Sequence, residues 1–219
     1  MTTTPRHLRA GAGQPGFDMS DALRHLRRAD PSLARIIRRS GPCLMRPKRT
    51  QSLFHALAES ITYQQLSGKA AATIFGRVVA LFAPKRFPTP ADLLAMPDAR
   101  LRGAGLSAAK TAALKDLARK SIDGTVPTLA RVKRLDDAEI VERLTAVRGI
   151  GVWTVEMLLI FRLGRPDVLP VADLGVRKGF MVTYGLDAMP KPAEMTALAE
   201  PWRPYRSVGS WYMWRACEL

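Results

Sequence analysis

The segment Leu144-Thr-Ala-Val-Arg-Gly-Ile-Gly-Val-Trp-Thr-Val-Glu156 decides the fold of this chain. Apolar residues at helical spacing run into Gly149-Ile-Gly151, and a second apolar helical pattern starts directly after it. This predicts two helices joined by a tight hairpin. Glycine accepts backbone angles that are closed to other residues and leaves the N–H groups of the turn uncovered, so a phosphate oxygen can bind there. Such a hairpin reads a nucleic-acid backbone and not a base sequence.

A second informative segment, Leu169-Pro-Val-Ala-Asp-Leu-Gly-Val-Arg177, follows a loop rich in glycine and proline, Gly164-Arg-Pro-Asp-Val-Leu-Pro170. Asp173 stands where this loop ends and is expected to begin a helix from Leu174 to Tyr184. An aspartate in that position usually serves only as an N-cap. The helix dipole and the free N–H groups there also favour a carboxylate that stays negatively charged, which leaves a chemical role open.

The composition points to a polyanionic partner. The chain has 34 Lys and Arg against 19 Asp and Glu, a formal net charge of +15 and a pI near 10.7. Charge alone does not separate DNA from ribosomal RNA or a membrane surface. The first fifty residues hold eleven Lys and Arg against three Asp, and residues 1–17 are predicted to form a flexible basic arm.

Other global features exclude several classes of protein. Apolar residues make up 47% of the chain, enough for a core, but no apolar run approaches the ~20 residues that span a bilayer. The N-terminus lacks an apolar signal core, so we expect a cytoplasmic, nucleoid-associated monomer. Cys43 and Cys217 have no partners at metal-binding spacing and are expected to be reduced. This spacing excludes a four-cysteine iron–sulfur loop, and no cofactor is expected.

Helical periodicity dominates the chain and predicts an all-α fold. Thr89-Pro90, Ser107 and Asp136 are typical helix starts. Residues 18–40 are expected to be helical, and so are the segments 52–66, 69–82 and 201–217.

The hairpin, the Gly/Pro loop and the aspartate, in this order and spacing, resemble the helix-hairpin-helix base-excision DNA glycosylases, and most closely the 3-methyladenine-DNA glycosylase II family. Two further segments, Ile61–Ala71 and Gly105–Thr111, strengthen the resemblance, which covers roughly residues 50 to 215. It implies two helical subdomains with a cleft between them: an outer one from residues 18–66 and 166–219, and a middle one from residues 67–165. The β-rich domain that precedes the helical core in some relatives is expected to be absent.

The resemblance also implies a chemistry. Asp173 would face the positive charge that develops on a sugar when the N-glycosidic bond of a flipped-out alkylated purine in double-stranded DNA breaks. Trp153 stands where strand-nicking relatives have a lysine that forms a Schiff base, so lyase activity is not expected. Its indole could instead stack on a cationic base, although packing in the core would also explain a tryptophan here.

The remaining site residues follow from the same resemblance. Met157, Tyr205, Trp202 and Tyr63 are expected to line the base pocket, with Met157 replacing an aromatic ring, whereas Trp211 and Trp214 are expected in the core. Gln65 would fill the hole that the flipped base leaves, unless it and Gln64 only cap the end of their helix. Contacts to DNA are expected from Gly149, Ile150, Gly151, Val152, Thr154, Gln64, Gln65, Leu66, Ser67, Lys69 and Lys110. The carbonyls of Thr145, Val147 and Ile150 would hold a sodium or potassium ion when DNA is bound.

Two other functions remain open at this point. A non-catalytic helix-hairpin-helix DNA-binding module would share the hairpin and the basic charge but would need neither Asp173 nor Trp153. A bifunctional glycosylase for oxidised bases is disfavoured by the missing lysine. The sequence leaves undecided which lesion is preferred among alkylated and deaminated purines.

Overall fold

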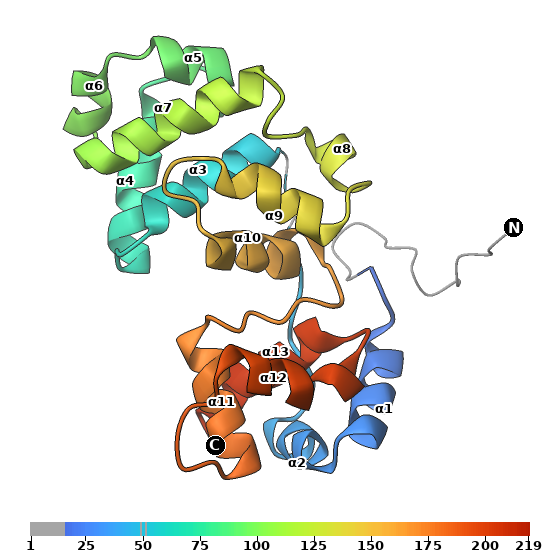
Figure 1. The fold of residues 1–219 in the computed structure, drawn as a ribbon. Coiled ribbons are helices and arrows are strands. Elements are labelled where there is room, and N and C mark those ends of the chain that lie inside the picture. Colours follow the sequence, from blue (N-terminus) through green and yellow to red (C-terminus); the bar gives the residue numbers. More distant parts are fainter. Residues whose placement is uncertain (1–15, 49, 51) are drawn as a thin grey trace, which may run out of the picture. The chain divides into compact units, whose positions relative to one another are not determined.

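The chain is helical throughout the part that the computed structural model describes, residues 16–48, 50 and 52–219 (Figure 1). These residues form thirteen α-helices, a π-helical turn and a short 3-10 turn, and they contain no strand. The all-α prediction is therefore confirmed. The expected arm at residues 1–17 lies almost entirely outside the described residues. Within the described part, no helix combines the length and apolar character needed to cross a bilayer.

The structure divides into two compact units. The terminal unit comprises residues 1–49 and 156–219, and the middle unit comprises residues 50–155. The predicted boundaries of 18–66, 67–165 and 166–219 differ from these units in two places. The helix α3 (Leu53–Tyr63) belongs to the middle unit, because its apolar face packs on helices of that unit. Residues 156–165 belong to the terminal unit.

The terminal unit is built around two packed helices, α11 (Leu174–Tyr184) and α13 (Arg206–Ala216), with α1 (Met19–Ala29) and α2 (Pro31–Ser40) against them. The helix α12 (Pro192–Leu198) and the 3-10 turn η3 (Glu200–Trp202) complete it. Gly179 explains the close approach of α11 and α13, since a Cβ there would lie 2.1 Å from the carbonyl oxygen of Met213. Any larger residue at position 179 would force the two helices apart.

Two predicted helices of the terminal unit differ from those observed. The helix expected over residues 18–40 is split in two, because Asp30 leaves helical geometry and caps α2 through the N–H groups of Ser32 and Leu33. The final helix starts only at Arg206, since the prolines at 201 and 204 cannot donate the backbone hydrogen bonds that a helix interior needs.

The middle unit contains α3, α4 (Gly68–Ala80), α5 (Pro90–Ala95), α6 (Asp98–Gly103), α7 (Ala108–Ile122), α8 (Leu129–Val132) and α9 (Asp137–Thr145). The predicted helix starts are confirmed, because the side chains of Thr89, Ser107 and Asp136 each accept a backbone N–H as N-caps. The helix α3 ends three residues before its predicted end at 66, since the chain turns at Gln64 and Gln65.

The helix after the hairpin, α10 (Val152–Leu158), spans the border between the units. It continues into the π-helical turn η2 (Leu159–Leu163), which ends at Gly164 in the left-handed conformation. The expected end of this helix at Gly164 is therefore confirmed. The Gly/Pro loop begins at this residue and leads to Asp173, which caps α11.

Candidate functional site

The hairpin between α9 and α10 is fixed by both its own backbone and side chains of α7. Gly149 has a φ of +77°, which favours glycine, and the N–H of Ile150 donates to the carbonyl of Val147 at 3.0 Å. From α7, Asp116 accepts the N–H of Arg148 at 2.8 Å, and the ammonium of Lys120 donates to the carbonyl of Ala146. The turn is thus held from the side of α7.

The glycines of the hairpin leave backbone donors available. The N–H groups of Gly149 and Gly151 have no acceptor among the described residues, and a Cβ on Gly151 would meet nothing within 4 Å. Val152, next in the chain, is also exposed. This pattern agrees with the expected binding of an anion by the turn.

Two expected DNA contacts of the hairpin need correction. Ile150 and Thr154 are buried, and their N–H groups already donate to the carbonyls of Val147 and Gly151. Both residues therefore anchor the turn in the middle unit, because neither an engaged N–H nor a buried side chain can reach a phosphate.

In the segment between α3 and α4, Gln64 has a different environment from Gln65 and Leu66, although all three were expected to contact DNA. The side-chain amide of Gln64 donates to the carbonyl of Gly149 at 2.9 Å, so Gln64 joins the end of α3 to the hairpin. Gln65 is exposed and has a φ of +57°, a conformation that costs a non-glycine residue of the order of 1 kcal/mol. Leu66 beside it is 39% exposed. Gln65 and Leu66, but not Gln64, are presented to solvent.

The ammonium of Lys110 has a structural role. Its Nζ donates to the carbonyls of Thr62 at 2.7 Å and Gln64 at 2.8 Å, and so closes the end of α3. These bonds use two of the three donors of the ammonium, and partial burial lowers its pKa. The DNA contact expected of Lys110 stays a prediction, as do those of Ser67 and Lys69, which are exposed at the start of α4 with Ser67 as the N-cap.

Asp173 is held in place from two directions. Its Oδ1 accepts the backbone N–H of Val176 at 2.8 Å and the indole N–H of Trp214 at 2.8 Å. The side chain is mostly buried, with the residue only 9% exposed. Trp214, from α13, was expected in the core, but the structure shows that it positions the carboxylate. Gly175 makes room for this indole, since a Cβ there would lie 2.7 Å from Trp214 Cδ1.

A second carboxyl group lies near the first and was not predicted. Glu156 is half-buried, and its Oε2 has no hydrogen-bond partner in the described structure. Burial, and then the negative charge of Asp173, raise the pKa of Glu156 from its ordinary value of 4.5 to about 7. The signal was present in the sequence, because Glu156 is the single acidic residue in the apolar stretch from 152 to 163.

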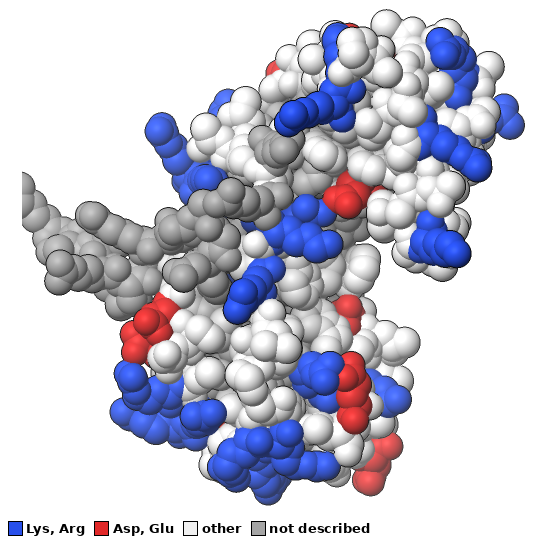
Figure 2. Space-filling model, turned by 180° about the vertical axis from the view of Figure 1, so that it is seen from behind, with Lys and Arg blue, Asp and Glu red and all other residues white. Residues whose placement is uncertain are grey.

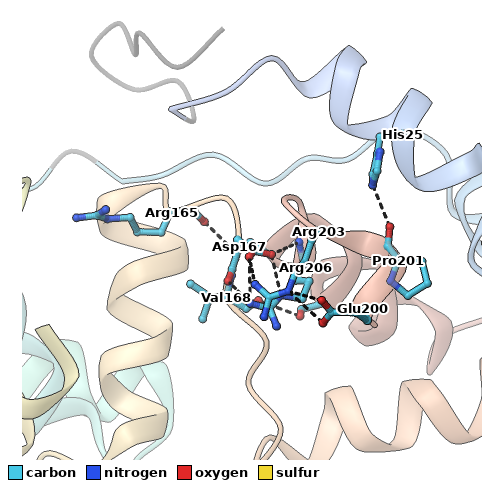
Figure 3. A network of polar contacts seen from close by, with 10 residues as sticks. His25, Arg165, Asp167, Val168, Glu200, Pro201, Arg203 and Arg206 are labelled. Carbon is cyan, nitrogen blue, oxygen red and sulfur yellow. Dashed lines mark hydrogen bonds and ion pairs between the residues drawn. The ribbon is translucent and has the colours of Figure 1, made fainter. Parts of the chain in front are cut away.

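The Gly/Pro loop is tied to the start of α13 by a network of charged and backbone contacts (Figure 3). Asp167 accepts hydrogen bonds from Arg206 Nε at 2.7 Å and Nη2 at 3.0 Å, and from Arg203 Nη1 at 2.7 Å. Glu200 holds Arg203 on its other side. This bidentate arginine pairing fixes the middle of the loop six residues before Asp173.

Ser207 fastens the same loop through backbone groups. Its N–H donates to the carbonyl of Pro166, its hydroxyl donates to the carbonyl of Arg165 at 2.7 Å, and it accepts the N–H of Val168 at 3.0 Å. Asp167, Arg206 and Ser207 were not predicted, because pairing between positions about forty residues apart leaves no local pattern in one sequence.

The aromatic residues expected in the base pocket have different environments. Trp202 is 0% exposed: its indole N–H donates to buried Asp30 at 2.8 Å, and its ring stacks on Phe180. Tyr205 is also buried, with its ring in contact with those of Phe17 and His25. Both side chains belong to the core of the terminal unit, so the structure does not present them to a base as expected.

The other pocket candidates remain open to solvent to different degrees. Trp153 is 47% exposed, so the alternative of a core tryptophan is contradicted. Met157 follows it by one turn on α10 and is half-buried, and Tyr63 is half-buried with its ring in a T-shaped contact with Phe75.

The expected site residues are divided between the two units. The middle unit brings together the hairpin and the Gln64 segment, and the terminal unit brings together Asp173, Glu156 and Trp214. The expected cleft stays a prediction.

Comparison with known proteins gives consistent relatives. DNA-3-methyladenine glycosylase 1 of Schizosaccharomyces pombe is 36% identical over 198 residues, which cover 89% of this chain and 86% of that protein. The structure is similar to that of the S. pombe 3-methyladenine DNA glycosylase in complex with abasic DNA, with a TM-score of 0.77 over 91% of this chain and 97% of that one. A DNA-3-methyladenine glycosidase from Bacillus halodurans gives a TM-score of 0.80 at 32% identity, over 89% of this chain and 88% of that one.

The family pattern described as HhH-GPD superfamily base excision DNA repair protein matches residues 58–204. This range contains the hairpin, the Gly/Pro loop and Asp173. Because the match covers most of the chain and agrees with the relatives above, the chain belongs to the HhH-GPD superfamily of base excision DNA repair proteins.

Proposed function

We propose that this protein is a monofunctional DNA glycosylase that hydrolyses the N-glycosidic bond of alkylated purines in double-stranded DNA. One observation carries the proposal: Asp173, at the end of the Gly/Pro loop, is oriented by two N–H donors in a chain whose relatives are DNA-3-methyladenine glycosylases. The protein would work wherever the DNA is held, which is the cytoplasm in a cell without a nucleus.

The proposed reaction breaks one bond and forms one. The bond between C1′ of the sugar and the base nitrogen breaks, and the electron pair leaves with the base. An alkylated purine that carries a positive charge departs as a neutral molecule, so it needs no strong general acid. Positive charge develops on the sugar, and the carboxylate of Asp173 stabilises it electrostatically. Asp173 guides a water molecule, which adds to C1′ and gives up its proton to the carboxylate of Asp173, from which it passes to solvent.

The proposal excludes lyase chemistry on the basis of Trp153. Strand cleavage by a glycosylase needs an amine that attacks the sugar and forms a Schiff base, and an indole nitrogen cannot do so. The exposed indole of Trp153 can instead stack on a base, and a cationic base would be attracted to its electron-rich face.

In this proposal the hairpin binds the DNA backbone without regard to the base. The N–H groups of Gly149 and Gly151 would donate to a phosphate. The carbonyls of Thr145, Val147 and Ile150 would hold a sodium or potassium ion against that phosphate. The carbonyl of Val147 already accepts the N–H of Ile150, but a carbonyl oxygen has a second lone pair for an ion. Gln65 would occupy the space that the flipped base leaves.

The proposal is tested by measuring release of 3-methyladenine and 7-methylguanine from methylated duplex DNA, with the Asp173→Asn variant as the control. Wild-type protein should release bases and leave abasic sites in intact strands. Borohydride added to the reaction should trap no covalent protein–DNA complex. Efficient trapping would contradict the monofunctional assignment and would point to a lysine elsewhere.

A non-catalytic DNA-binding module remains the second candidate. It would bind duplex DNA through the same hairpin, but it would release no base from any methylated duplex. The closeness of buried Asp173 and half-buried Glu156 disfavours this candidate, because a binding module gains nothing from placing two acids near each other at a cost in stability.

A further inference from the structure

A short arginine pattern occurs twice near the start of the described chain. Arg24-His-Leu-Arg-Arg28 lies on α1, and Arg35-Ile-Ile-Arg-Arg39 lies on α2. Positions i, i+3 and i+4 share one face of a helix, so each pattern places three guanidinium groups on one face. Neither the hairpin nor the chemistry at Asp173 accounts for this repeat.

The packing of α1 and α2 in the terminal unit leaves their arginine-bearing faces toward solvent. The apolar residues between and beside the arginines, including Leu26, Ile36 and Ile37, are buried in the terminal unit. His25 contacts the carbonyl of Pro201 at 3.0 Å and holds α1 against η3. All six arginines are exposed, and Figure 2 shows basic side chains gathered over α1 and α2, at the lower end of that view. We call these six residues the arginine face: Arg24, Arg27, Arg28, Arg35, Arg38 and Arg39.

The positive charge of the arginine face is largely uncompensated. Of the three acids in residues 18–40, Asp18 caps α1, buried Asp30 caps α2, and only Asp21 forms an ion pair with an arginine of the face, Arg24. The pair with Arg24 is exposed, and such pairs contribute little energy.

The other arginines form no ion pair with an Asp or Glu of the described residues. Arg35 donates to Ser32 Oγ, and Arg39 donates to a backbone oxygen of Leu219 at 3.0 Å. Arg27, Arg28 and Arg38 have no hydrogen-bond acceptor or ion-pair partner among the described residues. Three guanidinium groups are therefore available for an external anion.

We propose that the arginine face binds the phosphate backbone of duplex DNA outside the damaged nucleotide, as a second contact besides the hairpin. Guanidinium groups pair with phosphate oxygens in a bidentate manner, and arginines on two packed helices can neutralise several phosphates at once. The inference rests on the proposed function only for the identity of the polyanion. A membrane surface fits less well, because the large apolar side chains of α1 and α2 pack inside the unit and leave no apolar face to insert.

This contact would act on binding and not on chemistry. Arginines that pair only with phosphates read no base, so they raise the affinity for damaged and undamaged duplex alike. They also make binding more sensitive to salt, because each neutralised phosphate releases counterions. The arginine face would therefore lengthen the time that the protein stays on DNA while it searches for a lesion.

The test compares two triple variants that remove the same charge. The first replaces Arg27, Arg28 and Arg38 by glutamine, and the control replaces Arg131, Lys133 and Arg134, which are exposed in the middle unit, by glutamine. Affinity for an undamaged duplex is measured between about 50 and 200 mM salt. The first variant should lose about tenfold in affinity at the lowest salt, and the slope of log K against log salt should become shallower by about 2 to 3. The control should lose about twofold or less.

Two further measurements decide the interpretation. The single-turnover excision rate at saturating protein should be unchanged in the first variant, whereas Asp173→Asn should lose excision and keep the salt slope, so that failure of the proposed function and failure of this inference give different results. Equal losses in both triple variants, or no loss in the first, would overturn the inference. It would also be overturned if phosphatidylglycerol vesicles bound the wild-type protein more tightly than DNA does and only that binding needed the arginine face.

Discussion

The hairpin and the Gly/Pro loop are both turns that lead into a helix, and they treat negative charge in opposite ways. The hairpin ends at Gly151, which has no side chain, and its backbone donors remain uncovered. The loop ends at Asp173, whose own carboxylate accepts the N–H of Val176 in the first turn of α11 and the indole N–H of Trp214. The hairpin can therefore bind an external anion, whereas the end of the Gly/Pro loop already holds the carboxylate of Asp173. Under the proposed function, one local structure would serve DNA binding in one unit and chemistry in the other.

The means of support also differ between the two turns. The carbonyls of Ala146 and Gly149 in the hairpin accept from Lys120 and Gln64, and Asp116 accepts the N–H of Arg148, which leaves the N–H groups of Gly149 and Gly151 available. The loop is held through the carboxylate of Asp167, which two arginines clamp. Changes that affect the hairpin should therefore alter DNA binding, and changes that affect the loop should alter the rate of excision.

The largest effect is expected from Asp173→Asn. The amide keeps the shape of the side chain and its acceptor oxygen for Val176, but it removes the negative charge that stabilises the developing cation. Single-turnover excision of 3-methyladenine should fall about 100-fold or more, with binding of lesion-containing DNA little changed. Excision within about threefold of wild type would show that the carboxylate serves only as an N-cap.

Substitutions in the hairpin should affect binding and spare the chemistry. In Gly151→Val the new side chain has open space, so it covers the turn without a clash, whereas Gly149→Val also strains a backbone with a φ of +77°. Both variants should lose about tenfold in affinity for damaged and undamaged duplex alike, and only the second should also unfold at a lower temperature. A loss confined to one lesion would contradict a hairpin that is blind to the base.

Weakening the arginine pairing of Asp167 should have a smaller effect, on the rate of excision and not on DNA affinity. Asp167→Asn weakens the bidentate pairing with Arg206, so the loop and Asp173 should be less firmly positioned. We expect excision to slow about tenfold at saturating protein while DNA affinity stays the same. Arg203→Lys, which keeps a charge beside Asp167, is the matched control and should be close to wild type. A loss of DNA affinity in Asp167→Asn that is absent in Arg203→Lys would instead place the loop among the DNA contacts.

The smallest expected effect concerns pH. The pKa of Glu156 is raised from 4.5 to about 7 in the folded protein, so the folded state keeps a proton that the unfolded state releases between these values. Stability is therefore lost as pH rises through this window. Because Glu156 is only half-buried, we expect a contribution of about 1 kcal/mol. Glu156→Gln should be more stable relative to wild type at about pH 8 than at about pH 4 by this amount, as measured by urea unfolding. Parallel stability curves would contradict the assignment.

The sequence predicted what is local and missed what is distant. Helix starts at Thr89, Ser107 and Asp136 were correct, because an N-cap side chain and the backbone N–H that donates to it lie within three residues of each other. The placement of Asp173 before α11 was correct for the same reason.

The errors arose where side chains pair across the fold. Trp202 was assigned to a base pocket and Trp214 to the core, and the structure places Trp202 in the core and Trp214 on Asp173. Both indoles donate to a buried carboxylate, Asp30 in one case and Asp173 in the other. Nothing in the spacing of two aromatic residues says which acid each will meet. The role of Lys110 at the end of α3 was missed likewise, since its carbonyl partners lie more than forty residues away.

The backbone of Gln65 has a consequence for how this protein can evolve. Among the described residues it is the one non-glycine with a positive φ, so replacement by glycine would relieve strain without moving any neighbour. Selection for thermal stability alone should therefore favour glycine at position 65. Selection for DNA repair activity should instead keep a side chain there. If Gln65 fills the space left by a flipped base as proposed, the side chain at this position contributes to repair at a small cost in stability.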